Sequence, residues 1–168
     1  MPFGNDLRCD GCGRRESIRP VLYYYQLADD LRLTGMALPC WCYDCDGVRN
    51  SETLFTLDYV QHRLHEWEQD GLEHEQTRRN EFRRMEFDPD VEFQKELDKR
   101  RAAVSWRIAR RSPPRCLTCG STNQIAFDWH LDPGCRVPDC SGTLTSMTRF
   151  HFIQGVYDIL NDEGQKVG

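Results

Sequence analysis

Nine cysteines are the residues of this chain best suited to chemistry, and most of them fall into closely spaced pairs. Cys9 and Cys12 form one Cys-x-x-Cys pair, Cys116 and Cys119 form another, and a glycine follows each pair. Two thiolates at this spacing can face one point because the chain turns tightly between them, and four such thiolates make a tetrahedral zinc site. The spacing therefore predicts two zinc ions per chain, one at each end.

The first predicted site combines Cys9 and Cys12 with cysteines downstream. Cys42 and Cys45 repeat the two-residue gap and are the preferred partners, whereas Cys40 is the alternative fourth ligand. If Cys42 binds the metal, we expect Cys40 to be a small buried residue or a spare thiol beside the site. The first predicted ligand set is Cys9, Cys12, Cys42 and Cys45.

The second predicted site is built from Cys116, Cys119 and Cys140. Its fourth ligand is either Cys135 or His130, since a Cys3His set also binds structural zinc. Cys135 is preferred because it lies close to Cys140 and follows a turn-prone segment. In that case His130 is expected to be a strand residue or a hydrogen-bond donor to a thiolate.

Other uses of the cysteines are less favoured. Nine is an odd number, which leaves one thiol over in any full set of disulfides, and the start of the chain lacks the apolar stretch of a secretion signal. No apolar run is long enough to cross a bilayer. We therefore expect a cytoplasmic protein without a membrane partner. Iron is held by similar cysteine pairs, so the choice between zinc and iron stays open.

These pairs resemble the knuckles of the zinc-ribbon, or rubredoxin-like, class. The resemblance rests on Cys9-Asp-Gly-Cys12-Gly13 with Cys42-Tyr-Asp-Cys45, and on Cys116-Leu-Thr-Cys119-Gly120 with Cys135–Cys140; it covers residues 7–48 and 114–150. It implies three-stranded ribbons clamped by a metal that is usually structural. It does not imply one function, because such ribbons serve many.

Charge divides the chain into three sections. Residues 1–75 carry a net charge of −7, residues 76–115 of +5 and residues 116–168 of −3. The predicted fold is α+β, with two small zinc-ribbon β modules joined by a helical hairpin or arm. The predicted domains are an N-terminal ribbon at 1–50, a charged helical segment at 51–112 and a C-terminal ribbon at 113–168. Each end is too small for a large core, so metal is expected to supply stability.

The helical segment is predicted to hold two helices. Ser51 is a candidate N-cap with Glu52 in the first turn, and Asp70-Gly71 is a possible break. Asp88-Pro89-Asp90 is the clearer boundary, because aspartate suits an N-cap and proline suits the first helical position. Strands are expected at Ile18–Leu27, Leu31–Thr34, Gln124–Trp129 and Thr143–Phe152.

Catalysis is not predicted. His62-Arg-Leu-His65-Glu66 comes nearest to a metalloprotease helix, but its order is neither His-Glu-x-x-His nor His-x-x-Glu-His. It is better interpreted as the solvated face of a helix. Four cysteines per metal also leave no open position for a substrate.

A binding role remains, and two kinds of partner are considered. Arg78-Arg79, Arg83-Arg84, Lys99–Arg101 and Arg107–Arg111 could follow a nucleic acid, but acidic residues are interleaved at helical spacing. The preferred hypothesis is a protein-interaction module, such as an adaptor or an immunity-type inhibitor. Its partner would be another protein, and a basic partner could face Asp29, Asp30, Asp44 and Asp46.

Overall fold

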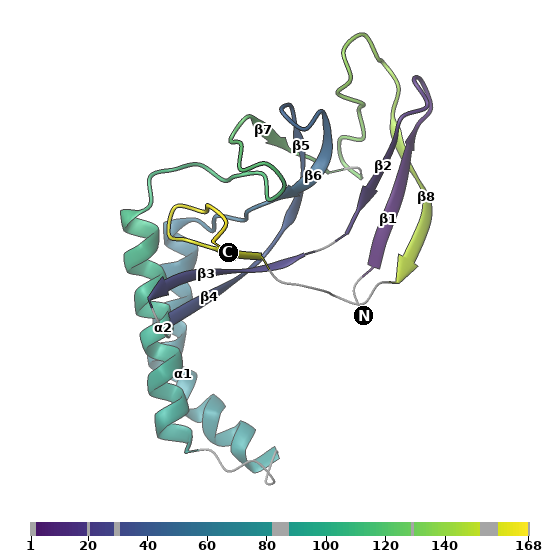
Figure 1. The fold of residues 1–168 in the computed structure, drawn as a ribbon. Coiled ribbons are helices and arrows are strands. Elements are labelled where there is room, and N and C mark those ends of the chain that lie inside the picture. The colour runs from purple at the N-terminus through teal and green to yellow at the C-terminus, as the bar shows by residue number, and fades with distance from the viewer. Residues whose placement is uncertain are drawn as a thin grey trace. The chain divides into compact units, whose positions relative to one another are not determined.

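The computed structural model describes residues 3–19, 21–28, 31–81, 88–128, 130–151 and 158–167. In these residues it contains two helices and nine strands, and the strands form three sheets of three (Figure 1). The predicted α+β class is confirmed. The strands are β1 (Phe3–Cys9), β2 (Arg15–Ile18), β3 (Leu22–Ala28), β4 (Leu31–Met36), β5 (Leu38–Cys42), β6 (Gly47–Ser51), β7 (Gln124–Ala126), β8 (Leu144–His151) and β9 (Asp158–Leu160), and the helices are α1 (Leu57–Glu81) and α2 (Pro89–Ala109).

The chain divides into two compact units. The first is made of Met1–Gln26, Thr34–Leu54 and Ser112–Gly168, and the second of Leu27–Leu33 and Phe55–Arg111. All nine cysteines belong to the first unit and both helices to the second. The first unit thus takes segments from both ends of the chain, whereas the predicted boundaries assign those ends to separate ribbons.

The first ribbon is the antiparallel sheet β2-β1-β8. β1 and β2 form a hairpin around the turn that carries Cys12, and β8 pairs with β1 so that Cys9 lies opposite Leu144. Along β1, Leu7 and Cys9 are buried, while Asp6 and Arg8, which alternate with them, are exposed. This alternation is typical of a sheet with one face on a core and one in water.

The second ribbon is the sheet β6-β5-β7. β5 and β6 form a hairpin around Cys42 and Cys45, and β7 pairs antiparallel with β5, with Cys42 opposite Gln124. β7 follows the turn that carries Cys116 and Cys119. Each ribbon is therefore a hairpin completed by a strand from the last third of the chain.

The two ribbons are nested in the sequence. The hairpin of the first ribbon comes first and that of the second follows; after the helices, the second ribbon is completed by β7 before the first is completed by β8. All three strands of the second ribbon therefore lie, in the sequence, between the hairpin of the first ribbon and its third strand, β8. The ends of the chain are consequently interleaved within one unit.

The ribbons share one apolar core. Trp41 of β5 is fully buried and lies in one cluster with Leu7, Leu144 and Cys135 of the first ribbon. Phe127, which follows β7, contributes a tilted ring 6.4 Å from that of Trp41. Burial of a large aromatic between two small sheets stabilises both, since neither sheet could enclose such a side chain alone.

A buried carboxylate also links the ribbons. Glu16 of β2 accepts a hydrogen bond from Nε of Arg14 at 2.6 Å and one from Nη1 of Arg49 in β6 at 3.3 Å. Arg14 pairs in addition with Asp46 at 2.9 Å, and its guanidinium lies over the Trp41 ring. A carboxylate that is largely removed from water needs such partners, so this network fixes β2 against β6.

The start of the first helix was predicted wrongly. Ser51 ends β6, and Glu52 is buried, where its two oxygens accept hydrogen bonds from the hydroxyl of Tyr25 and the amide of Arg115. α1 begins at Leu57 instead, and the preceding Thr56 caps it. Glu52 therefore joins distant segments of the first unit and does not stabilise a helix dipole.

The helical unit contains an antiparallel pair (Figure 1). α2 begins at the predicted place, where the side chain of Asp88 accepts a hydrogen bond from the amide of Asp90 and Pro89 is the first helical residue. α1 continues through Gly71, which is buried under the Trp67 ring; a Cβ there would lie 2.7 Å from the ring. This glycine does not break the helix but makes room for the indole.

Candidate metal centres

The first centre lies at one end of the first ribbon and gathers Cys9, Cys12, Cys135 and Cys140. The Sγ atoms of Cys9 and Cys140 are 3.5 Å apart, and those of Cys12 and Cys135 are 3.9 Å apart. All four sulfurs lie within 4.8 Å of one another. Residues more than 120 positions apart in the chain thus meet at one point because β8 pairs with β1.

The second centre lies at the corresponding end of the second ribbon and gathers Cys42, Cys45, Cys116 and Cys119. Here the Sγ atoms of Cys42 and Cys119 are 3.6 Å apart, and those of Cys45 and Cys116 are 3.9 Å apart. The pairing of β7 with β5 brings the two halves of this centre together.

The spacing of the sulfurs fits a tetrahedral metal ion. A zinc–sulfur bond is about 2.3 Å long, which makes the edge of a regular tetrahedron of sulfurs about 3.8 Å. The four distances given above, 3.5 to 3.9 Å, bracket that edge, and all the other pairs in each group lie within 4.8 Å. A disulfide would need sulfurs about 2.0 Å apart, and all nine cysteines are free thiols. Both groups could therefore hold a metal ion.

The partition of the ligands differs from the prediction. Cys9 and Cys12 were expected to share a metal with Cys42 and Cys45, but they meet Cys135 and Cys140, and the two middle pairs meet each other. Local spacing defines which cysteines form a pair, whereas strand pairing decides which two pairs meet. Either partition gives each centre one Cys-x-x-Cys-Gly phrase, so no local signal separates them.

The two contested residues lie outside both groups. Cys40 is buried on β5, two residues before Cys42, and burial raises the pKa of its thiol to about 12. His130 is exposed in a turn, where its amide donates to the carboxylate of Asp128. The structure thus places Cys42 and Cys135, the preferred ligands, among the tetrads.

The two Cys-x-x-Cys-Gly phrases adopt the same backbone. Gly13 and Gly120 have φ values of +75° and +76°, and their amides donate to the carbonyls of Cys9 and Cys116. Only glycine adopts this left-handed conformation without a steric cost. Asp46 occupies the corresponding place after Cys45 with a φ of +48°, so one knuckle tolerates a side chain there.

A side-chain clasp closes the first centre. Asp10 accepts hydrogen bonds from the amide and the hydroxyl of Thr143, at 2.7 and 2.9 Å, and the hydrogen bond from the amide lowers the pKa of Asp10. Beside it, Gly142 approaches the opposite knuckle so closely that a Cβ would lie 2.5 Å from the amide nitrogen of Gly11 and 2.7 Å from the sulfur of Cys9. The knuckles of this centre therefore touch through their backbones.

The second centre has a clasp of similar kind. The amide of Tyr43 donates to the carbonyl of Asn123, and the side-chain amide of Asn123 donates to Asp44 at 2.8 Å. A hydrogen bond from the side chain of Ser121, followed by that from Asn123, lowers the pKa of Asp44. Asp44 and Asp46, which were expected to face a basic partner, are thus engaged within the unit, and Asp29 and Asp30 lie outside the described residues.

The thiols of one centre differ in their electrostatics. A hydrogen bond from the amide of Cys12 lowers the pKa of Cys9 to about 7, whereas burial raises the pKa of Cys135 to about 12. Burial also raises the pKa of Cys45 in the second centre. Four clustered thiolates repel one another, so a divalent cation is what would allow all of them to ionise together.

The histidine-containing segment of α1 forms ordinary helix-surface contacts. His62 lies 3.5 Å from Glu66, Arg63 pairs with the same carboxylate, and His65 contacts Gln69. These side chains are largely exposed, and none belongs to a metal-binding group among the described residues. No described helix is long and apolar enough to cross a membrane.

Comparison of the chain with protein-family models, with curated proteins and with solved structures finds no match.

Proposed function

We propose that each centre binds one zinc ion and that both ions are structural. The observation that carries this proposal is the set of four Sγ–Sγ distances, 3.5 to 3.9 Å, which match a tetrahedral S4 site at each of two ribbon ends. Four thiolates complete the coordination of zinc and leave no position for a substrate or an activated water. On this proposal the metals hold the nested ribbons together and take no part in a reaction.

Metal analysis tests this proposal directly. Protein purified without added metal should contain about two zinc ions per chain by elemental analysis, and replacement by cobalt should give the absorption of tetrahedral thiolate ligation. Iron in place of zinc would correct the identity of the metal, and a folded chain without metal would contradict the proposal. Removal of the metal by a chelator should unfold the first unit, because binding energy in such small modules is folding energy.

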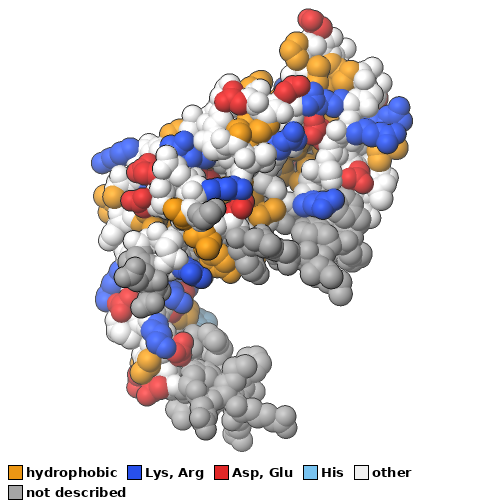
Figure 2. All heavy atoms as spheres, viewed as in Figure 1, with side chains coloured by type: hydrophobic (Ala, Val, Ile, Leu, Met, Phe, Trp, Pro, Cys, Tyr) orange, Lys and Arg blue, Asp and Glu red, His pale blue; other side chains and the backbone are white. Residues whose placement is uncertain are grey.

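We further propose that the protein is a non-catalytic binding module whose partner is another protein. The pairing of charges in the helical unit supports this over a nucleic-acid partner. Basic side chains there contact acidic ones within the unit, and the two signs are interspersed on the viewed face (Figure 2). The pairs are Arg63–Glu66, Lys95–Glu92, Lys99–Glu96, Arg100–Glu96 and Arg101 with Glu68 and Asp98.

An arginine that already has a carboxylate partner contributes less to phosphate binding, because the carboxylate must be displaced or tolerated near the phosphate. Of the other arginine groups considered from the sequence, Arg78-Arg79 and Arg83-Arg84 have side chains outside the described residues. In the last group, Arg107 donates to the carbonyl of Phe55 and Arg110 lies over the Trp106 ring. The overall charge of −5 also opposes association with a polyanion.

The choice between protein and nucleic acid can be decided by two parallel experiments. Fluorescence anisotropy with labelled duplex DNA, single-stranded DNA and RNA near physiological salt should give no binding tighter than about micromolar, a typical non-specific level. In parallel, cross-linking in the native cell followed by mass spectrometry should recover a protein partner. Tight oligonucleotide binding that is lost when Lys99, Arg100 and Arg101 become alanine would replace this proposal with the nucleic-acid one.

A further inference from the structure

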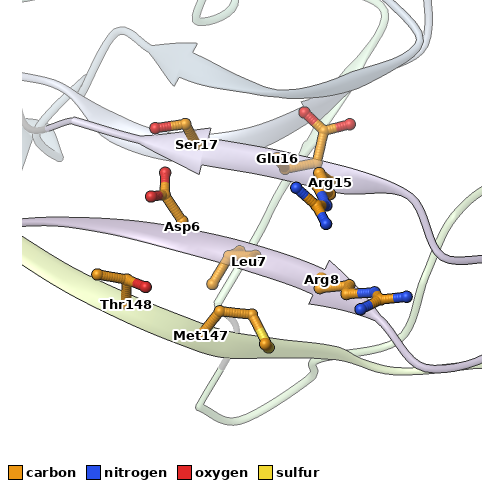
Figure 3. A pocket seen from close by; sticks show the side chains of 8 residues that line it. All are labelled: Asp6, Leu7, Arg8, Arg15, Glu16, Ser17, Met147 and Thr148. Carbon is orange, nitrogen blue, oxygen red and sulfur yellow. The ribbon is translucent and has the colours of Figure 1, made fainter.

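The exposed face of the first ribbon carries a hollow of about 490 Å³ (Figure 3). Figure 3 shows Arg8 of β1 and Arg15 of β2 at one end of it, and Asp6 with Ser17 toward the other. These four side chains are exposed, and all of them lie on the face opposite the apolar core. The hollow is therefore a surface feature, separate from the metal centre.

Arg8 and Arg15 are direct cross-strand partners in the antiparallel pair of β1 and β2. Side chains at such positions have Cβ atoms about 5 Å apart, and like charges placed this way destabilise a sheet. Neither guanidinium makes an ion pair within the described chain, in contrast to Arg14 and Arg49 of the same unit. Two unpaired guanidiniums side by side form a site for an anion with two acceptor atoms.

An apolar side chain lies next to this pair. Asp6 pairs with Thr148 and Leu7 with Ser146, so Met147 is an extra residue in β8 and forms a bulge. A bulge changes the direction in which side chains point. Met147 is 61% exposed and lines the hollow. A flexible thioether in such a position adapts to apolar partners of different shape.

We propose that this face binds an acidic segment of a partner protein, with a carboxylate held by Arg8 and Arg15 and a neighbouring apolar side chain against Met147. The inference rests on the proposed protein-binding function and names the chemistry of the segment that the first ribbon recognises. The hydroxyls of Ser17 and Thr148 line the same hollow and supply further hydrogen bonds to the segment.

A peptide fits this face better than a nucleic acid for two reasons. Asp6 lies in the same hollow as the arginines, so a continuous run of phosphates would be repelled by it more strongly than carboxylates separated by apolar residues are. Met147 offers apolar contact but no flat ring on which a base could stack. The arginine pair, the carboxylate of Asp6 and the exposed Met147 together favour a peptide in which acidic and apolar residues alternate.

The test is a binding titration of the full-length, metal-loaded protein with a short labelled peptide in which glutamate and leucine alternate. Arg8→Ala and Arg15→Ala should each weaken binding roughly tenfold, as expected for loss of a charge-assisted hydrogen bond. Asp6→Asn should tighten it roughly threefold, because a repulsive charge is removed. Arg101→Ala, which removes an exposed arginine of the helical unit, is the matched control and should change nothing. Metal content and circular dichroism verify that each variant is folded.

Two further probes make every outcome decisive. A peptide of alternating glutamine and leucine should bind at least roughly tenfold more weakly, since it lacks the carboxylates. Equal binding of both peptides, or of wild type and the arginine variants, overturns the inference. If neither the acidic peptide nor an oligonucleotide binds, this inference fails while the proposed function stands. Oligonucleotide binding that is lost in the Arg8 and Arg15 variants overturns both.

Discussion

The first and second centres have the same four-thiol composition, but they are closed by different means. In the first, Gly11 and Gly142 bring two backbones into direct contact beside the Asp10–Thr143 clasp. In the second, Tyr43 and Asn123 are joined by a backbone hydrogen bond and the side chain of Asn123 donates to Asp44, but neither Gly47 nor Gly120 lies against the opposite knuckle. A centre in which two glycines touch depends on the absence of side chains, and one without such a contact has more room to adjust.

The centres also differ in what surrounds them. The second has a fifth thiol, Cys40, buried beside it, and a non-glycine residue, Asp46, in a left-handed conformation after its first knuckle. The first also holds a non-glycine residue in a left-handed conformation, Asp139 with a φ of +63°, but it shares its cluster with the common core around Trp41 and has Gly142 against the sulfur of Cys9. We therefore expect the first centre to be the more sensitive to added volume and the second to be the more tolerant.

The largest expected effect separates the centres by their ligands. Cys9→Ser and Cys135→Ser should each leave about one zinc ion per chain, and so should the double variant, because both cysteines serve one metal. Cys9→Ser combined with Cys116→Ser should leave none. Elemental analysis of the four proteins distinguishes the arrangements. Had the pairs met as the sequence predicted, the double variant with Cys135 would lose both metals.

This partition is the part of the site that could not be predicted. Every residue of the two tetrads was identified from spacing, because a knuckle is a local structure of a few residues. Which knuckles meet depends on β1 pairing with β8 and β5 with β7, and these contacts join residues far apart in the sequence. Pairing of this kind is specified by the packing of the shared core and leaves no short motif.

The fold shows the same division between local and distant signals. The start of α2 at Asp88-Pro89 was predicted, because capping is local. The strand expected over Ile18–Leu27 covers the last residue of β2 and all of β3 except Ala28, and β1, β5 and β6 were not predicted. β5 consists largely of Pro, Cys and Trp, which have no alternating pattern, and it is a strand because both its neighbours bond to it. Trp129 and Phe152, at the ends of two expected strands, lie outside the described residues.

The next largest effect should come from adding a single methyl group to the first centre. Gly142→Ala places a Cβ against the amide of Gly11 and the sulfur of Cys9, so the knuckles must separate. We expect the first metal to be lost and the free energy of unfolding to fall by roughly 3 kcal/mol, within the range for severe local strain. Zinc content and urea unfolding measure both. Gly134→Ala, in the same knuckle but with its nearest contact at 3.4 Å, is the control and should retain two metals.

A smaller effect is expected at the fifth thiol. Cys40→Val should retain both metals and cost less than about 1 kcal/mol, since Cys40 is a buried apolar residue, whereas Cys42→Ser should lose the second metal. Burial raises the pKa of Cys40 to about 12, so at pH 8 it keeps its proton. Iodoacetamide should therefore leave it unmodified in the metal-loaded protein, as peptide mapping can verify. A lost metal in Cys40→Val would assign this thiol to the centre, whereas rapid alkylation at that pH would contradict its burial.

The smallest effect should appear at Asp46, which follows Cys45 where glycine follows the other two Cys-x-x-Cys pairs. Its φ of +48° costs a side chain roughly 1 kcal/mol that glycine avoids, while its carboxylate gains an exposed ion pair with Arg14 that contributes less than about 1 kcal/mol. Asp46→Gly should thus be neutral or slightly stabilising, and Asp46→Ala should be destabilising because it keeps the strain and loses the pair. Asp46→Asn measures the contribution of the charge alone, since asparagine tolerates the left-handed conformation as aspartate does. Urea unfolding of the zinc-saturated proteins should give Asp46→Gly a free energy of unfolding about 1 kcal/mol higher than that of Asp46→Ala. Should alanine equal glycine, the tolerance of this knuckle would have to come from its clasp and not from its backbone.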